Sequence, residues 1–269
     1  RIDSSVTETP LHATPEAPAA LSRRQIPLAL GIVLLTIALG IVRGTPGVIG
    51  AYHDDGVYVA TAKALADGRG YVQPFLPDPL PQTKFPPFLP ALFALIWKLA
   101  PEFPRNAVLF QGTCLLSMSL ATALTFLLLV RFRFASVAAA LAAAGLCACC
   151  PAFLYFGTLA LSEGPFALLT IGSFWAIEET LHARERKRLL AWAALAGALV
   201  ALAGLCRTLG FVWAGAAAVL FFLRARGALA VFLLLALPPL VGWVAWASWA
   251  RSTAVEPLFY WYVDYGSWW

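Results

Sequence analysis

The stretch RRQIPLALGIVLLTIALGIVRGTPGVIGAYHDDGVY, residues 23–58, decides what class of protein this chain is. Two arginines precede an uncharged apolar segment at residues 25–42, and two adjacent carboxylates, Asp54 and Asp55, follow it after a short connection. An apolar segment flanked in this way predicts a membrane anchor. A secretory signal peptide begins similarly, but no clear small-x-small cleavage site follows before Asp54, which favours an uncleaved signal anchor.

The composition extends this conclusion from the anchor to the whole chain. Of its 269 residues, 61% are hydrophobic and only 12% are charged, and the mean hydropathy is +0.78. A soluble domain of this size does not need so much apolar surface, so several membrane spans are expected. The net charge of +5 is modest and argues against nucleic acid as a partner.

Six further apolar stretches follow the anchor. Each of them reaches or approaches the roughly 20 residues that cross a bilayer, and residues 208–223 are the shortest. The chain therefore predicts an all-α polytopic protein with about seven transmembrane helices. The six stretches are 106–130, 134–162, 164–181, 189–206, 208–223 and 227–250.

Residues 86–99 are ambiguous, because they can cross the membrane or lie along its surface. Basic residues accumulate on the cytoplasmic side of membrane proteins. A surface position for residues 86–99 leaves four basic clusters on that side, whereas a spanning position exports the last three. We therefore predict an amphipathic surface helix, which Pro90 and Lys98 also favour. The four clusters are Arg23/Arg24, Arg131/Arg133, Arg184/Arg186/Lys187/Arg188 and Arg224/Arg226.

The resulting topology has a cytoplasmic N-terminus and a long outer loop at about residues 43–105. This loop is predicted to carry two interfacial helices, near residues 54–67 and 86–99. Residues 1–24 are rich in Ala, Pro, Thr and Ser and are expected to form a disordered cytoplasmic tail.

The other end of the chain is expected on the outer face, where residues 251–269 form an aromatic tail suited to the headgroup level. A membrane module would then occupy residues 25–250. The chain begins at Arg1 and not at Met, so we expect a fragment of a longer protein, truncated after the aromatic tail.

Five ionisable residues gather on the outer face in this topology, and such groups are costly near a membrane unless they are paired or functional. A carboxylate can take a proton from an acceptor hydroxyl, and cations can neutralise a phosphate that leaves from a sugar. The combination predicts a lipid-phosphate donor. The five residues are Asp54, Asp55, Lys84, Glu163 and Arg207.

Each of these residues also has a purely structural interpretation. The two aspartates can mark a solvated loop entry, and Lys84 can be an ordinary surface lysine. Glu163 follows Ser162 and precedes Gly164-Pro165, so this segment can simply begin a helix. Arg207 can be an interfacial anchor whose charge reaches water.

The five cysteines all lie in apolar stretches. The cluster Cys147-Ala148-Cys149-Cys150 looks like a metal site, but no histidine is near it in the sequence, and thiolates within lipid would be costly. Together with Cys114 and Cys206, these cysteines are expected to be small buried apolar residues.

The order of several short motifs resembles the transmembrane module of GT-C glycosyltransferases. Within that group, the chain is most similar to bacterial aminoarabinose transferases of lipid A and protein O-mannosyltransferase-like enzymes. The resemblance covers roughly residues 25–250. Its motifs are Asp54-Asp55-x-x-Tyr58, Leu65-Ala66-x-Gly68-x-Gly70-Tyr71, Lys84-Phe85-Pro86-Pro87-Phe88-Leu89-Pro90, Leu161-Ser162-Glu163-x-Pro165-Phe166 and Leu205-x-Arg207-Thr208-x-Gly210.

The resemblance implies a transfer of sugar from a polyprenyl-phosphate donor to a lipid, glycan or protein acceptor, at the outer face of a bacterial inner membrane. It implies that Asp54 is the catalytic base, with Asp55 beside it and Glu163 as the second acidic position. Lys84 and Arg207 match basic positions near the donor phosphate, and Tyr58 is expected to line the substrate.

The resemblance leaves the cofactor open. Some relatives use a divalent cation, Mg²⁺ or Mn²⁺, between their two acidic loops, and Asp54 and Glu163 would permit one. Many relatives also have more spans and a soluble outer domain after this module. The sequence ends at Trp269, so we expect the acceptor-binding part to lie outside it.

Two other functions compete with the transferase. A transporter or lipid flippase should place polar groups within its spans and often shows repeated halves, whereas here the spans are clean and the charges cluster at one face. A non-catalytic subunit would keep the module without the chemistry, and the presence of Asp54 argues against that.

Overall fold

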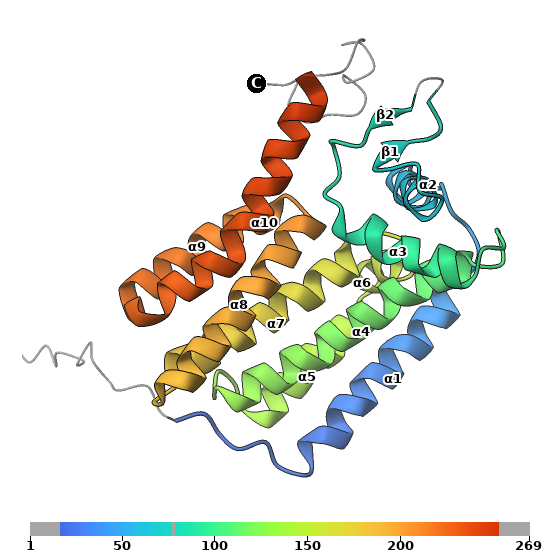
Figure 1. The fold of residues 1–269 in the computed structure, drawn as a ribbon. Coiled ribbons are helices and arrows are strands. Elements are labelled where there is room, and N and C mark those ends of the chain that lie inside the picture. The colour runs from blue at the N-terminus through green and yellow to red at the C-terminus, as the bar shows by residue number, and fades with distance from the viewer. Residues whose placement is uncertain (1–16, 77–78, 253–269) are drawn as a thin grey trace, which may run out of the picture.

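The computed structural model describes residues 17–76 and 79–252, and this part of the chain is mostly helical (Figure 1). The predicted all-α class is confirmed, apart from one short two-stranded ladder. Residues 1–16 of the tail predicted at 1–24, and residues 253–269 of the aromatic tail predicted at 251–269, lie outside the described residues. The elements are α1 (Gln25–Arg43), α2 (Asp54–Ala66), β1 (Val72–Gln73), β2 (Leu80–Pro81), α3 (Phe88–Leu99), α4 (Ala107–Arg131), α5 (Val137–Cys149), α6 (Pro151–Gly157), α7 (Glu163–His182), α8 (Arg186–Cys206), α9 (Leu209–Arg224) and α10 (Arg226–Ser252).

Within the described residues, four helices are long and apolar enough to cross a membrane, namely α1, α4, α8 and α10. The predicted span at residues 134–162 is not one straight helix. Its two parts, α5 and α6, meet at an angle of 64°, and together they count as a fifth candidate. The break falls at Cys150, whose backbone is extended, and Pro151 begins the next helix.

The remaining two predicted spans are helical but do not qualify by themselves. Helix α9 has 16 residues and is about 24 Å long, which is less than the roughly 30 Å of a hydrocarbon core. Helix α7 is longer, but Glu178 and Glu179 make its last turns polar. The structure thus supports an integral membrane protein with four or five candidate spans.

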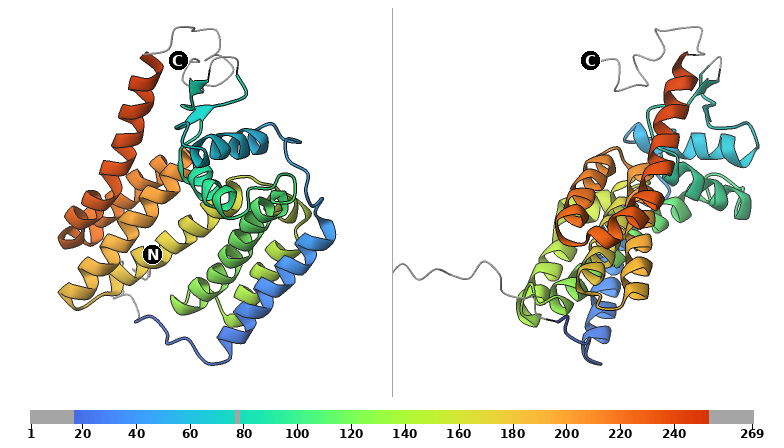
Figure 2. Two further views of the ribbon diagram at one scale, coloured as in Figure 1. Left: turned by 45° about the vertical axis from the view of Figure 1, so that its right-hand side comes forward. Right: turned by 60° about the vertical axis from the view of Figure 1, so that its left-hand side comes forward.

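Helices α2 and α3 occupy the two places where surface helices were predicted. They lie together across one end of the helical bundle (Figures 1 and 2). The indole Nε1 of Trp97 in α3 donates a hydrogen bond of 3.0 Å to the carbonyl of Val59 in α2. This bond satisfies a buried polar group and fixes one helix against the other.

The strands β1 and β2 form a two-residue antiparallel ladder that the sequence did not predict. It projects at the same end of the bundle as α2 (Figure 1). Tyr71, just before β1, contacts the rings of Trp243 and Trp246 in α10, at centroid distances of 6.0 and 5.7 Å. The C-terminal half of α10 therefore supports the loop that joins α2 to α3.

Small residues bring the other helices close together. A Cβ on Gly197 of α8 would lie 2.5 Å from the carbonyl oxygen of Phe232 in α10, so this crossing needs a glycine. Seven buried alanines, together with larger side chains such as Phe221 and Phe232, form the rest of the contact between α7, α8, α9 and α10. Small residues at such crossings are typical of membrane helices, because they let backbones approach.

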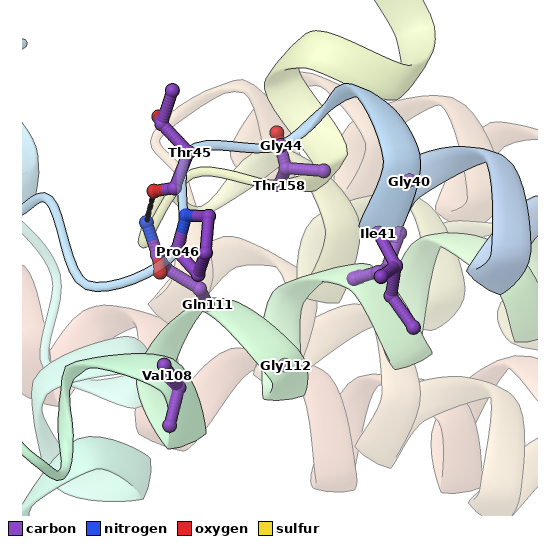
Figure 3. Close-up of a pocket in the computed structure, with 10 residues that line it drawn as sticks. Gly40, Ile41, Gly44, Thr45, Pro46, Val108, Gln111, Gly112 and Thr158 are labelled. Atoms are coloured by element: carbon purple, nitrogen blue, oxygen red, sulfur yellow. Dashed lines mark hydrogen bonds between the residues drawn. The ribbon is translucent and has the colours of Figure 1, made fainter.

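The connection from α1 to α2 is fastened by one side chain of α4. The Gln111 amide accepts a hydrogen bond from Gly47 N at 2.8 Å and donates to the carbonyls of Thr45 and Val48. A mostly apolar cavity of about 170 Å³ lies beside this clamp, between α1 and α4 (Figure 3). Gln111 thereby holds the loop that leads to Asp54.

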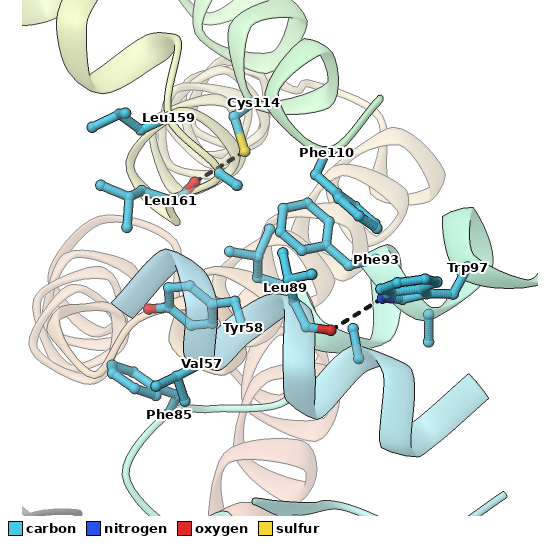
Figure 4. Packing of buried hydrophobic residues seen from close by; sticks show 14 residues of the cluster. Val57, Tyr58, Phe85, Leu89, Phe93, Trp97, Phe110, Cys114, Leu159 and Leu161 are labelled. Atoms are coloured by element: carbon cyan, nitrogen blue, oxygen red, sulfur yellow. Dashed lines mark hydrogen bonds between the residues drawn. The ribbon is translucent and has the colours of Figure 1, made fainter. Parts of the chain in front are cut away.

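A compact aromatic cluster lies beneath α2 and α3. The ring of Phe110 packs at a tilt against both Phe93 and Trp97, and Tyr58 and Phe85 pack at 4.7 Å between ring centroids (Figure 4). Leu161 joins the cluster from the segment before α7. The cluster thus connects α2, α3, α4 and the start of α7 into one rigid support.

The expected burial of the cysteines is right for two of them and wrong for three. Cys114 and Cys206 are buried, whereas Cys147, Cys149 and Cys150 are exposed on the bundle surface. The buried face of α5 carries alanines instead, such as Ala140 and Ala144. An exposed face in a membrane is apolar too, so hydrophobicity did not reveal which face packs inward.

Candidate functional site

Four of the five charged residues predicted for the site line one pocket of about 170 Å³ at the end of the bundle covered by α2 and α3. Asp54 comes from the first turn of α2, and Lys84 from the connection between β2 and α3. Glu163 comes from the first turn of α7, and Arg207 from the break between α8 and α9. Residues far apart in the sequence therefore converge, which agrees with the predicted topology that put them on one face of the membrane.

The four charges form two pairs that face the same pocket. Arg207 Nη1 lies 2.5 Å from Glu163 Oε1, which is a charge-assisted hydrogen bond. Lys84 Nζ lies 3.9 Å from Asp54 Oδ1, which is too long for a hydrogen bond. The Lys84 side chain is 14% exposed and also lies over the Phe85 ring. This burial makes an ordinary surface role for Lys84 a poor description.

Glu163 has bonding capacity left over. Its Oε2 atom is buried and has no hydrogen-bond partner among the residues that the structure describes, although Oε1 is bound to Arg207. Helix α7 does begin at Glu163, as the structural interpretation expected, with Ser162 as its N-cap residue, but the Ser162 side chain makes no capping hydrogen bond. Glu163 does benefit from the first turn of α7, where a negative charge is favoured, but one of its oxygens stays available to a ligand.

Arg207 is held at the pocket by the sharp turn between α8 and α9. A Cβ on Gly210 would lie 2.4 Å from the backbone nitrogen of Gly204, so the turn requires glycine there. Burial opposes the charge on Arg207, but the hydrogen bond and charge of Glu163 outweigh it and hold the pKa of Arg207 above its ordinary value. Arg207 remains a cation directed into the pocket.

Tyr58 lines the pocket as well, which was expected. Its hydroxyl donates a hydrogen bond of 3.3 Å to Ser162 Oγ, which links α2 to the segment before α7. Burial, more than the nearby charge of Asp54, raises the pKa of Tyr58 well above its ordinary value. The phenol therefore stays protonated and serves as a hydrogen-bond donor.

Asp55, unlike Asp54, does not line the pocket. Its carboxylate is fully buried and accepts hydrogen bonds from the backbone of Gly50, Tyr52 and Gly56, at 2.9, 3.2 and 2.8 Å. These bonds fold the turn that precedes α2. Their donors are backbone N–H groups of residues that do not line the pocket. Asp55 therefore stabilises the turn that places Asp54 at the first residue of α2.

Gln82 is a supporting residue that the sequence interpretation missed. Its side chain is buried, and its Oε1 accepts hydrogen bonds from the backbone of Lys84 and Phe85, at 3.1 and 3.4 Å. These bonds set the turn that points Lys84 into the pocket. The signal was a polar Pro81-Gln82-Thr83 run just before Lys84, in a loop expected to be exposed.

Two buried cysteines hold the backbone next to Glu163. Cys114 Sγ donates to the carbonyl of Leu161 at 3.1 Å, and Cys206 Sγ lies 3.7 Å from the carbonyl of Ser162. Gly164 brings this segment against α4, because a Cβ there would lie 2.3 Å from the carbonyl oxygen of Cys114. The position of Glu163 thus depends on a backbone contact.

We expect Gly164→Ala to lower the thermal unfolding midpoint and to displace Glu163. The added methyl group meets the α4 backbone, which cannot yield as a flexible side chain would, and overpacking of this kind costs roughly 1–3 kcal/mol. The matched control is Gly145→Ala in α5, where nothing lies within 4 Å of an added Cβ. Equal stability of the two variants would show that the α4–α7 contact is not close.

The pocket fits a divalent cation poorly. Mg²⁺ prefers several oxygen ligands, whereas Asp54 and Glu163 already face Lys84 and Arg207. A metal ion between the carboxylates would lie beside two other cations. Among the residues that the structure describes, no cluster of three or more His, Cys, Asp or Glu side chains could hold a metal ion.

We compared the chain with protein families, curated proteins and solved structures, and found no relative. No family model matches the chain, and no curated protein or solved structure matches it.

Proposed function

We propose that the protein is a membrane glycosyltransferase that moves a sugar from a polyprenyl-phosphate-linked donor to a lipid, glycan or protein acceptor. The observation that carries this proposal is the joint placement of two cations and two carboxylates in one pocket at the end of an apolar helical bundle. The cations suit the phosphate of a lipid-linked donor, and the carboxylates suit the acceptor hydroxyl.

Asp54 acts as the general base in this reaction. It takes the proton of the acceptor hydroxyl while the acceptor oxygen bonds to the sugar carbon. The bond from that carbon to the phosphate oxygen breaks, and polyprenyl phosphate leaves with the bonding electrons. Lys84 and Arg207 neutralise the charge that develops on this leaving group.

The long contact between Lys84 and Asp54 suits an exchange of partners. A donor phosphate competes for Lys84, whose distance from Asp54 is already 3.9 Å. When Lys84 turns to the phosphate, the carboxylate of Asp54 is left to face the acceptor hydroxyl. The free Oε2 of Glu163 meanwhile accepts a hydrogen bond from a hydroxyl group of donor or acceptor.

Donor binding should depend on Lys84 and Arg207. Loss of one charge-assisted contact is worth about 1.5–3 kcal/mol, so Lys84→Gln or Arg207→Gln should weaken donor binding roughly 10–150-fold. The measurement is binding of a polyprenyl-phosphate sugar to the purified protein.

The matched controls for these variants are Lys98→Gln and Arg105→Gln, two exposed cations that do not line the pocket. They should bind the donor as the parent protein does. If Lys84→Gln and Arg207→Gln also bind like the parent, the donor phosphate is held elsewhere.

The proposal includes a finer topology. Seven spans, with α7 and α9 completed by their neighbours, put the N-terminus in the cytoplasm and the pocket on the outer face of a bacterial inner membrane. The distribution of basic residues supports this orientation. Two non-catalytic functions, a lipid transporter and a subunit without chemistry, share this topology and differ in lacking any donor cleavage.

An impermeant thiol reagent tests the orientation in a chain whose five native cysteines are replaced by alanine. A cysteine at exposed Glu102 should label from outside intact cells, and one at exposed Lys187 should label only after lysis. Labelling of the Lys187 position in intact cells would reverse the orientation.

A further inference from the structure

The end of the bundle opposite the candidate site holds a polar cavity of about 300 Å³. Helix α7 connects the two ends, since it runs from Glu163 in the site to His182 at the cavity, and its 20 residues are about 30 Å long. The cavity is bounded by the end of α4, the end of α7 and the start of α8.

Arg131 lines this cavity, but its guanidinium group is already bound to other groups of the protein. Arg131 Nε lies 2.6 Å from Glu179 Oε1, and its Nη1 donates a hydrogen bond of 3.0 Å to the carbonyl of Ala19. The backbone of Ala19 also donates to the carbonyl of Arg131 at 2.8 Å. The chain before α1 is thus bound to the end of α4, and Arg131 is already occupied.

Two other arginines keep their charges available. Arg184 is exposed and forms no ion pair within residues 17–76 and 79–252. Arg188 lies 3.6 Å from Glu185, but both side chains are more than 70% exposed, and such surface pairs contribute little. Arg184 and Arg188 can therefore both turn to an anion in the cavity.

An apolar track begins at the same cavity. Trp192 lines it, and Leu195, Leu199 and Leu202 follow at spacings that keep them on one side of α8. Leu195 and Leu202 are exposed, at 43% and 36%. An inorganic phosphate ion would gain nothing from these apolar side chains, whereas the acyl chain of a phospholipid can pack against them.

We propose that this cavity binds the headgroup of an anionic phospholipid in the leaflet opposite the candidate site. Arg184 and Arg188 hold the phosphodiester, Trp192 lies at the headgroup level, and the acyl chain follows the leucines of α8. Basic pockets at the ends of membrane helices recognise anionic headgroups in this way. The site does not depend on the transferase chemistry, because it lies at the other end of α7.

The test compares phosphatidylglycerol with phosphatidylcholine on the purified full chain, by native mass spectrometry of bound lipid. Phosphatidylglycerol should be retained preferentially. The double variant Arg184→Gln/Arg188→Gln should bind it about 30-fold more weakly. The matched control is Arg186→Gln/Lys187→Gln, which removes the same charge from the same segment but does not line the cavity.

The control variant should keep the preference for phosphatidylglycerol. Equal losses in the two double variants would mean diffuse attraction to a basic surface and would overturn the site. Equal retention of phosphatidylcholine by the parent would do the same. Full displacement of the lipid by inorganic phosphate would overturn the lipid assignment, since a lipid held by its acyl chain resists such competition.

Discussion

Asp54→Asn should reduce sugar transfer by about 10²–10⁴-fold, the usual cost of losing a general base. The amide keeps the shape of the carboxylate but cannot take the acceptor proton. Donor binding should not weaken, because a carboxylate repels the phosphate instead of holding it. Folding should also change little, because the Asp54 side chain is 37% exposed and its contact with Lys84 is long.

Sugar transfer is measured for this variant in liposomes, beside donor binding and the thermal unfolding midpoint. A matched control is Asp67→Asn, at the other end of α2, where the side chain is also 36% exposed and ion-paired with Lys63. Asp67→Asn should keep its activity. Full activity in Asp54→Asn would remove the proposed mechanism.

Asp55→Asn should act through stability instead of chemistry. The buried carboxylate receives three backbone N–H groups on its two oxygens, and an amide can offer an oxygen on only one side. Its NH₂ group then faces a donor, and a buried donor without a partner costs roughly 1–3 kcal/mol. We expect a lower unfolding midpoint and reduced transfer, since the turn that places Asp54 is disturbed.

The two variants can be told apart by measuring stability and transfer together. Asp54→Asn should lose transfer at an unchanged midpoint, and Asp55→Asn should lose both. Loss of transfer at an unchanged midpoint in Asp55→Asn, with Asp54→Asn active, would move the base by one residue and keep the enzyme class.

The difference between these neighbours shows where the sequence stops being informative. Adjacent residues on a helix point about 100° apart, so only one of two successive carboxylates can face a given pocket. Nothing in the pair Asp54-Asp55 says which one. That depends on the turn before α2, where Asp55 collects N–H groups from Gly50 and Tyr52.

The long helices were predictable because each is an extended apolar run, and both surface helices were found within a few residues of their expected bounds. The break at Pro151 was missed because the run on both sides of it is equally apolar. The β1–β2 ladder was missed because two-residue strands leave no periodicity.

The sequence predicted that the charged site residues lie together. In the predicted topology, Glu163 and Arg207 lie at breaks between apolar segments, and both breaks fall on the same side of the membrane. The pairing of Arg207 with Glu163 and of Lys84 with Asp54 depends on how α2, α7 and α8 pack. So does the support from Gln82 and Gly164, whose roles arise from contacts with distant backbone.

The most direct test of the central claim is release of polyprenyl phosphate from a radiolabelled polyprenyl-phosphate sugar by the reconstituted protein, supplied with membrane extract as the source of acceptor. The parent protein should release it, Asp54→Asn should release it at least 10²-fold more slowly, and Arg105→Gln should match the parent. Intact donor after incubation with the parent, or equal release by Asp54→Asn, would contradict the account.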